Sequence, residues 1–221
     1  MKTPKRTYAL ISGIALIIMA VAAGYAYGYV QNSLIVDGNP STTLKNLNNA
    51  TGLFGSAVIG WFIILITDLL VAWGLYKYFT TVNSKVAAVT GLVRAFYSLI
   101  LAVAIYQLIA VWQMLYSAIP DEIALMNLYN SFEKYWSLGL IVFGLHLIGL
   151  GYLSLKSNSV PKWLGWLLYF AGFSYSLING VKALIPNATD TIAIVEMSVS
   201  GPMAIAELGL AIWLIWKGGK K

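Results

Sequence analysis

Apolar residues occur along the chain in long runs, which short polar segments separate. A helix needs about 20 mostly apolar residues to cross a membrane, because the hydrocarbon core is about 30 Å thick and a helix rises about 1.5 Å per residue. Six runs meet this requirement. They cover residues 8–30, 53–79, 86–118, 136–155, 163–184 and 191–216. The pattern predicts an all-α fold in which residues 1–221 form a single transmembrane domain, a six-transmembrane-helix bundle.

The charged residues between the runs predict an orientation. With the N-terminus in the cytoplasm, ten basic residues fall in inner segments and three in outer loops. The inner residues are Lys2, Lys5, Arg6, Lys77, Lys85, Lys156, Lys162, Lys217, Lys220 and Lys221, and the outer residues are Lys45, Lys134 and Lys182. Cytoplasmic loops are enriched in Lys and Arg. Both termini are therefore expected in the cytoplasm, and the first run is expected to be a retained helix because it is longer than a signal-peptide core.

Composition supports the same class and removes several chemistries. Apolar residues make up 59% of the chain and charged residues 10%, whereas soluble domains carry roughly a quarter charged. The net charge of +6 follows from the loop bias, so no nucleic-acid partner is expected. The chain has no cysteine and one histidine, which excludes disulfides, Cys-ligated zinc and multi-histidine metal sites. No phosphate-loop or dinucleotide motif is present, so neither a metal nor a cofactor is expected.

Two outer loops are longer than the others. Residues 31–51 are polar and rich in Asn, and we expect irregular structure there. Residues 119–135 contain Pro120, Asp121 and Glu122, a sequence typical of a helix start. This helix could lie at the membrane interface, or it could extend the fourth span outward, and the sequence leaves both alternatives open.

Five stretches carry a resemblance to a known family. They are DLLVA followed by GLYK in residues 68–77, GLVR in 91–94, GLHLIGLGYL in 144–153, PKWLG in 161–165 and AELGLAIWLIWKG in 206–218. In this order and spacing, the chain from about Gly60 to Trp216 resembles the bacterial membrane family named domain of unknown function 4386. The resemblance implies a multi-pass protein of the cell (cytoplasmic or inner) membrane in a bacterial setting. It implies no mechanism.

Four ionisable residues fall inside predicted spans: Asp68, Arg94, His146 and Glu207. Each costs at least about 2.5–3.5 kcal/mol to insert, so each requires a reason. Counted from the cytoplasmic helix ends, all four lie about 12–15 Å deep. Four helices thus place a polar group in one layer, which predicts an interhelical cluster.

The expected pairing follows from depth and helix order. Asp68 and Arg94 lie on sequence-adjacent antiparallel helices, which predicts a direct salt bridge. Glu207 shares a helix face with small residues, one turn below an expected kink at Pro202, at the depth of His146. We therefore expect Glu207 to face a cavity within one water-bridged contact of His146. Two carboxylates against one arginine leave one negative charge, so His146 or a carboxyl group should hold a proton.

Further polar residues are secondary candidates for lining this cavity. Tyr97 and Ser98 follow Arg94 by about one turn, Tyr175 and Asn179 share a face of the fifth span, and Ser200 precedes the proline. Trp136, Trp163, Trp166, Trp213 and Trp216 lie near span ends and are interpreted as an aromatic belt without a binding role.

Three functions remain open at the level of sequence. The first is a small permease or binder of a small or lipophilic molecule that uses the polar cluster as its anchor. The second is an intramembrane enzyme with a carboxylate–histidine acid–base pair, although no catalytic residue is assigned. The third is a non-catalytic accessory protein whose cluster is purely structural. The expected partners are membrane lipids and a small lipophilic ligand, and the oligomeric state is not predicted.

Overall fold

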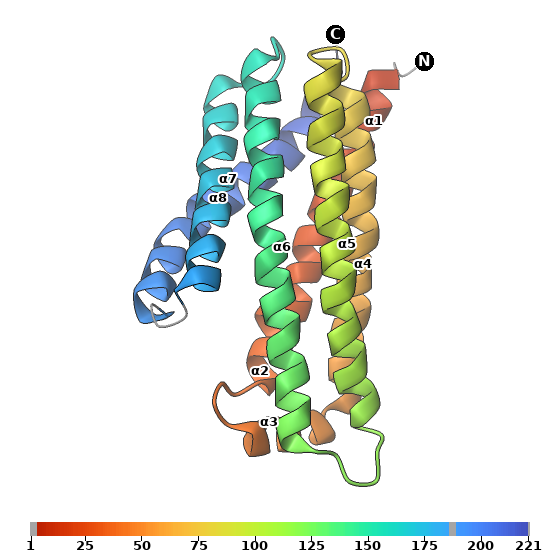
Figure 1. The fold of residues 1–221 in the computed structure, drawn as a ribbon. Coiled ribbons are helices and arrows are strands. Elements are labelled where there is room, and N and C mark those ends of the chain that lie inside the picture. Colours follow the sequence, from red (N-terminus) through yellow and green to blue (C-terminus); the bar gives the residue numbers. More distant parts are fainter. Residues whose placement is uncertain (1–3, 186–188, 221) are drawn as a thin grey trace.

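The structure is a computed structural model that describes residues 4–185 and 189–220 (Figure 1). Within these residues every regular element is helical, which confirms the all-α class. The elements are α1 (Pro4–Ala23), the π-helical segment η1 (Gly24–Gln31), α2 (Asn32–Leu34), α3 (Pro40–Asn49), α4 (Thr51–Phe79), α5 (Ser84–Met114), α6 (Glu122–Lys156), α7 (Lys162–Leu184) and α8 (Thr189–Trp216). Lys2 and Lys221, which entered the charge count above, lie outside the described residues.

The long helices form a ring in chain order. α1 packs on α4, α4 on α5, α5 on α6, α6 on α7, and α8 on both α7 and α1. Successive long helices run antiparallel, and the two ends of the chain lie at the same end of the bundle (Figure 1).

Five helical stretches of the described chain are long and apolar enough to cross a membrane: Pro4–Leu34, Thr51–Phe79, Ser84–Met114, Glu122–Lys156 and Ile194–Trp216. The outer surface of the ring also exposes large apolar side chains, including Leu92 at 69% and Leu99 at 64%. Such a surface is stable against lipid and not against water. The chain is therefore built as a multi-pass membrane protein.

Glycines bring α6 close to both of its neighbours. A Cβ atom added at Gly144 would lie 2.5 Å from the carbonyl oxygen of Gly172, so these two glycines let the backbones of α6 and α7 touch. On the other side of α6, a Cβ atom at Gly149 would collide with the side chain of Thr90 in α5. Small residues of this kind are typical of membrane helix contacts. The close approach of α5 and α6 positions the candidate site.

The polar loop of residues 31–51 is not irregular as expected, because it contains α3. The Asn39 side chain accepts a hydrogen bond from the backbone N–H of Thr42, and Pro40 occupies the first helical position. Both are helix-start signals. The apolar side of α3 then packs inward through the buried Leu47.

For residues 119–135 the structure decides between the two alternatives, an interfacial helix and an extension of the fourth span. α6 runs without interruption from Glu122 to Lys156, so the segment is an extension of the fourth span and not a separate interfacial helix. Its start is the expected one, since the Asp121 carboxylate accepts hydrogen bonds from the backbone N–H groups of Ile123 and Ala124.

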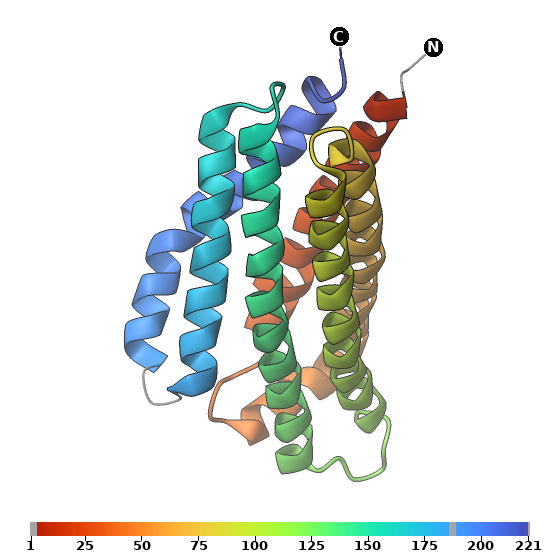
Figure 2. The ribbon, with the colours of Figure 1, turned by 45° about the horizontal axis from the view of Figure 1, so that its top comes forward.

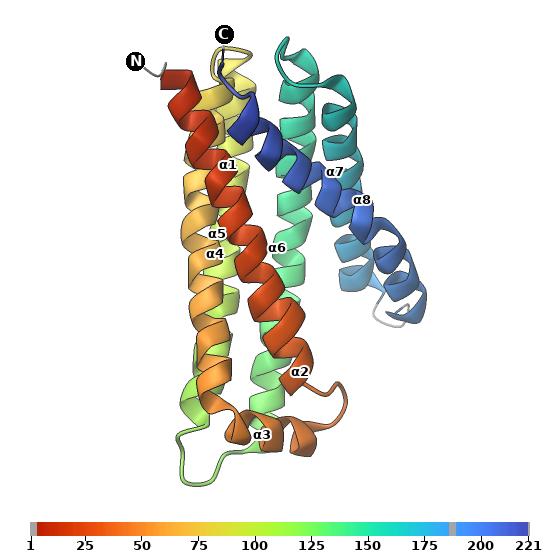
Figure 3. The same ribbon diagram turned by 180° about the vertical axis from the view of Figure 1, so that it is seen from behind.

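The ring is closed between α1 and α8 at one end only. Arg6 donates to the carbonyl oxygens of Leu214 (2.9 Å), Gly218 (2.8 Å) and Ile215, which satisfies the C-terminal carbonyls of α8. From this end the two helices diverge (Figure 3). Pro202 lies inside α8, as expected, and α8 bends along its length (Figure 2).

Candidate functional site

Asp68 and Arg94 form an ion pair in the interior of the bundle. Arg94 Nη2 lies 2.5 Å from Asp68 Oδ1, and the two side chains are 1% and 0% exposed. Asp68 comes from α4 and Arg94 from α5, the antiparallel neighbours that a turn of a few residues joins. The salt bridge expected from the sequence is confirmed.

Neighbouring side chains hold this pair in place. The Ser98 hydroxyl donates to Asp68 Oδ2 at 2.6 Å. Arg94 Nη2 also contacts the sulfur of Met19 at 3.5 Å, and its guanidinium lies 5.1 Å from the centre of the Phe143 ring. A desolvated charge requires such contacts, because water does not reach it. The pair is thus a built structural element that links α1, α4, α5 and α6.

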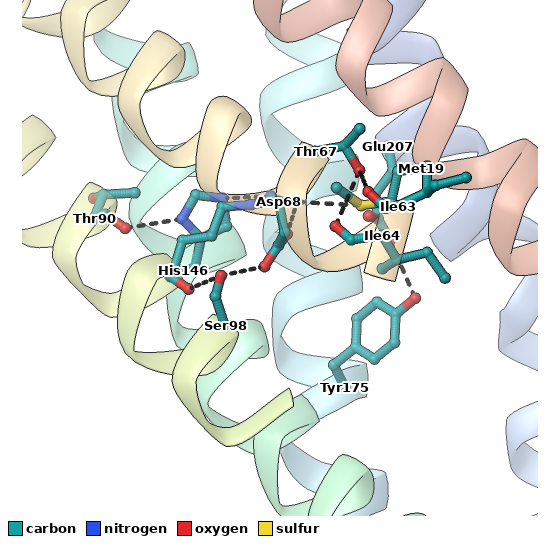
Figure 4. Close-up of polar contacts among 11 residues, drawn as sticks. Met19, Ile63, Ile64, Thr67, Asp68, Thr90, Ser98, His146, Tyr175 and Glu207 are labelled. Atoms are coloured by element: carbon teal, nitrogen blue, oxygen red, sulfur yellow. Dashed lines mark hydrogen bonds and ion pairs between the residues drawn. The ribbon is translucent and has the colours of Figure 1, made fainter. Parts of the chain in front are cut away.

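His146 completes the pair, and its two contacts define its tautomer. Nδ1 lies 2.9 Å from the carbonyl oxygen of Thr90, and Nε2 lies 3.1 Å from Arg94 Nη1 (Figure 4). A carbonyl only accepts and a guanidinium only donates. Nδ1 must therefore carry the hydrogen and Nε2 must accept, so His146 is neutral. We call Asp68, Arg94 and His146 the buried triad.

A cavity of about 470 Å³ lies beside the triad, and we call it the inner cavity. Its walls come from all six long helices and η1. The lining residues are Leu16, Met19, Ala20, Ala23, Tyr27, Trp61, Ile64, Asp68, Tyr97, Trp136, Leu140, Phe143, Tyr175, Glu196, Ser200, Met203, Ala204, Glu207 and Leu208. Most of them are apolar or aromatic, as is typical of a site for a small molecule.

Glu207 is the fourth predicted cluster residue, and it lies in the wall of this cavity. Its Oε1 accepts a hydrogen bond of 3.1 Å from the Tyr175 hydroxyl. Among the residues that the structure describes, no Lys, Arg or His nitrogen lies within 4.0 Å of its carboxylate. Glu207 thus has a hydrogen-bond donor but no cationic partner.

The predicted contact between His146 and Glu207 is wrong. Both ring nitrogens of His146 are occupied by Thr90 and Arg94, and His146 does not line the inner cavity. In Figure 4, Thr90 and His146 lie on one side of Asp68, whereas Tyr175 and Glu207 lie on the other. The neutral imidazole also excludes the alternative in which His146 holds the extra proton in this arrangement. The four residues therefore form a buried triad and a separate cavity carboxylate, and Asp68 lies between them.

The secondary candidates divide in the same way. Tyr97, Tyr175 and Ser200 line the inner cavity, as expected. Ser98 does not line it; this residue is buried and donates a hydrogen bond to Asp68 instead. Asn179 lines a second cavity, where its Oδ1 accepts from the Ser137 hydroxyl at 2.8 Å.

The second cavity has a volume of about 800 Å³, and we call it the outer cavity. It shares four lining residues with the inner cavity: Tyr27, Trp136, Leu140 and Glu196. A salt bridge of 2.7 Å joins Lys182 of α7 to Glu196 of α8 at this junction. Both side chains are partly exposed, so water screens the pair. The two cavities therefore adjoin at these four residues, and the outer cavity extends from them toward the end of the bundle opposite the chain termini.

Sequence reasoning missed the aromatic wall at this junction. The sequence pattern assigns Trp136 to an aromatic belt, but its ring centre lies 4.8 Å from that of Tyr27 and 5.1 Å from that of Trp61, and all three residues line the inner cavity. Gln31 is also new: it is fully buried and accepts from Trp61 Nε1 at 2.7 Å. The π-helical turn of η1, which carries both Tyr27 and Gln31, has no signal in the sequence pattern.

Metal chemistry has no visible ligand set in the described part of the chain. No group of three or more His, Asp or Glu side chains is close enough there to hold an ion.

Comparison with known proteins supports the resemblance noted from the sequence. The chain is similar to an uncharacterized protein of Archaeoglobus fulgidus, with 30% identity over 164 residues, 74% of this chain and 85% of the relative. This relative is archaeal, so the bacterial setting does not follow from the similarity. No solved structure matches the chain. The family model described as domain of unknown function (DUF4386) matches residues 11–218, and the chain belongs to that family.

Proposed function

We propose that this protein is a small membrane permease or binder that holds a small lipophilic molecule in the inner cavity. The observation that carries the proposal is a cavity of about 470 Å³ inside a membrane bundle, with apolar and aromatic walls and one carboxylate, Glu207, that has no cationic partner among the described residues. Ligand pockets of about 300–1,000 Å³ with few polar groups are typical of small-molecule sites.

The route into the cavity is consistent with a lipophilic ligand. Three lining residues of α8, Ser200, Ala204 and Leu208, are exposed, so the cavity reaches the surface of the bundle beside α8. Part of the opposite wall is α1, which diverges from α8 along this side (Figure 3). A molecule dissolved in the bilayer would enter between these helices, and one from the aqueous phase would enter through the outer cavity.

We propose further that six helices span the cytoplasmic membrane and that both chain termini lie in the cytoplasm. α7 would be the sixth span: it has 23 residues and packs along the full-length helix α6. Its Trp, Tyr and Asn residues lower its mean hydropathy. Of these, Tyr175 and Asn179 have hydrogen-bond partners inside the ring, whereas Trp163 and Trp166 are exposed on its surface. The shared position of the two chain ends and the clustering of Lys and Arg at that end support this orientation.

The chain has no cysteine, so single cysteines test this topology directly. A membrane-impermeant maleimide applied to intact cells should label Ser117→Cys and Ala183→Cys. It should label Asn158→Cys only after permeabilisation. Labelling of Asn158→Cys and Ala183→Cys from the same side would show that α7 does not cross.

The two other functions that the sequence leaves open, an acid–base enzyme and a structural accessory protein, explain the cavity less well. An acid–base pair of Glu207 and His146 is disfavoured, because both imidazole nitrogens have other partners. A purely structural role fits the buried triad, whose charges are paired, but it leaves the cavity and Glu207 without a reason.

Thermal unfolding in a neutral detergent tests the proposal. A panel of small lipophilic molecules, cationic, neutral and anionic, should contain members that raise the unfolding temperature of the protein in proportion to the logarithm of their concentration. Ala204→Trp, which fills the cavity from an exposed lining position, should abolish the shift. Ile205→Trp is the matched control, because Ile205 is 57% exposed and does not line the cavity. Equal shifts in both variants would refute binding at this site.

A further inference from the structure

The inner cavity has charged lining residues of one sign. They are Asp68, Glu196 and Glu207, and no Lys or Arg of the described chain lines it. This excess is notable in a chain whose net charge is +6. The cavity is therefore electronegative although the protein as a whole is basic.

The charge balance around the cavity leaves one carboxylate over. Arg94 lies 2.5 Å from Asp68, and Lys182 lies 2.7 Å from Glu196. His146 is neutral, as its two hydrogen bonds require. Two cations thus face three carboxyl groups, and the carboxyl group without a cation is that of Glu207. An unpaired charge within a membrane bundle is costly, so the site calls for a proton or a cation from outside the protein.

The walls of the cavity suit an organic cation better than a metal ion. Tyr27, Trp61 and Trp136 line one part of it, and their rings pack within 4.8–6.4 Å of one another. Tyr97 and Tyr175 line another part, where Tyr175 donates to Glu207. Aromatic faces attract ammonium and similar cations when water is absent. By contrast, an inorganic ion needs several ligands close together, and no group of three or more His, Asp or Glu side chains is close enough among the described residues to hold one.

We propose that the molecule held in the inner cavity is a lipophilic organic cation, an amine or a quaternary onium ion, with Glu207 as its counter-ion and the aromatic side chains as its wall. This inference rests on the proposed function and narrows its substrate class. A carboxylate without a cationic partner disfavours an anion by repulsion. A neutral ligand would provide no counter-charge, so Glu207 would have to hold a proton instead.

Two ions of nearly equal shape and opposite charge test the inference. Tetraphenylphosphonium, tetraphenylborate and neutral triphenylphosphine are titrated against the purified protein in a neutral detergent, and their dissociation constants are compared. Tetraphenylphosphonium should bind at least about tenfold more tightly than the other two. Glu207→Gln should remove most of this preference, whereas Asp37→Asn should not, because Asp37 is an exposed acid that does not line the inner cavity.

Each outcome decides a different statement. If the neutral or the anionic probe binds as tightly as the cation, and Ala204→Trp abolishes that binding, the proposed function stands and the inference is overturned. If the wild-type protein binds none of the probes, the inference is overturned for this size of cation, and the wider panel of small molecules decides the proposed function. If Glu207→Gln does not fold, Glu207→Asp takes its place; this variant keeps the charge and must retain the preference for the cation. In that case the comparison of the three probes on the wild-type protein decides the inference.

Discussion

His146 donates a hydrogen bond from Nδ1 to the carbonyl oxygen of Thr90, 2.9 Å away, and this leaves Nε2 as the acceptor for Arg94. The contact is possible because Gly149 lets α5 and α6 approach closely at Thr90. Both ring nitrogens of the single histidine are therefore occupied, one of them by the arginine, and the ring is not available to a ligand. Predictions for the triad and for the cavity can therefore be separated.

The tautomer of His146 is directly observable. The chain contains one histidine, so a long-range proton–nitrogen correlation spectrum of the labelled protein has a single imidazole signal set. At neutral pH we expect the pattern of a neutral ring protonated on Nδ1. A ring protonated on both nitrogens, or on Nε2 alone, would contradict the described geometry.

Removal of Arg94 should cost more than removal of the whole ion pair. Arg94→Ala leaves the fully buried Asp68 without its counter-ion, and this should destabilise the protein by about 3–5 kcal/mol. Arg94→Ala combined with Asp68→Ala should recover part of the loss. Thermal unfolding in detergent, together with the yield of monodisperse protein, gives the comparison. Equal losses in the single and double variants would mean that Asp68 does not depend on Arg94.

The contact between α6 and α7 predicts a glycine-specific effect. Gly144→Ala would bring a Cβ atom within 2.5 Å of the Gly172 carbonyl oxygen, so the helices must separate. We expect a loss of about 1–3 kcal/mol, as for other overpacked contacts. The matched control is Gly180→Ala in α7, where an added Cβ meets nothing within 4 Å and should be neutral or slightly stabilising. Comparable unfolding temperatures for both variants would argue against this packing.

Water access along α8 should follow the cavity. A single cysteine in place of Ser200, which lines the inner cavity, should react with a small polar thiol reagent, because the inner cavity adjoins the outer cavity. Ile205→Cys on the lipid-facing surface of the same helix should react at least about tenfold more slowly, because the reactive thiolate needs water. Similar rates at both positions would show that the cavity is not a distinct aqueous path.

The sequence predicts those contacts of the site that depend on how deep each residue lies in the membrane. Asp68 and Arg94 lie on adjacent antiparallel helices at similar depth, and their distance follows from those two facts. Rotation about the helix axis is different. His146 and Glu207 share a depth, but α6 turns His146 toward α5, whereas α8 packs on α7 and α1 and presents Glu207 to Tyr175. Depth alone does not determine which neighbour a side chain faces.

The aromatic wall shows a second limit. A tryptophan near a span end, such as Trp136, satisfies the pattern of an interfacial belt and of a buried wall equally well. The structure decides between them, because Trp136 packs on Tyr27 of η1. The wider turn of a π-helix changes the face on which Tyr27 lies, and the hydrophobic periodicity of the sequence does not predict such a turn. Trp163 and Trp166, at 57% and 64% exposure, do lie on the surface as a belt requires.

Photolabelling tests most directly whether the inner cavity is a binding site. A small lipophilic aryl diazirine is activated on the purified protein in lipid nanodiscs, and mass spectrometry locates the adducts. We expect adducts on cavity-lining residues such as Tyr175, Met203 and Trp136, and an excess of an unlabelled ligand from the thermal-unfolding panel should suppress them. Adducts confined to lipid-facing residues such as Leu92 and Leu99, unchanged by the competitor, would contradict it.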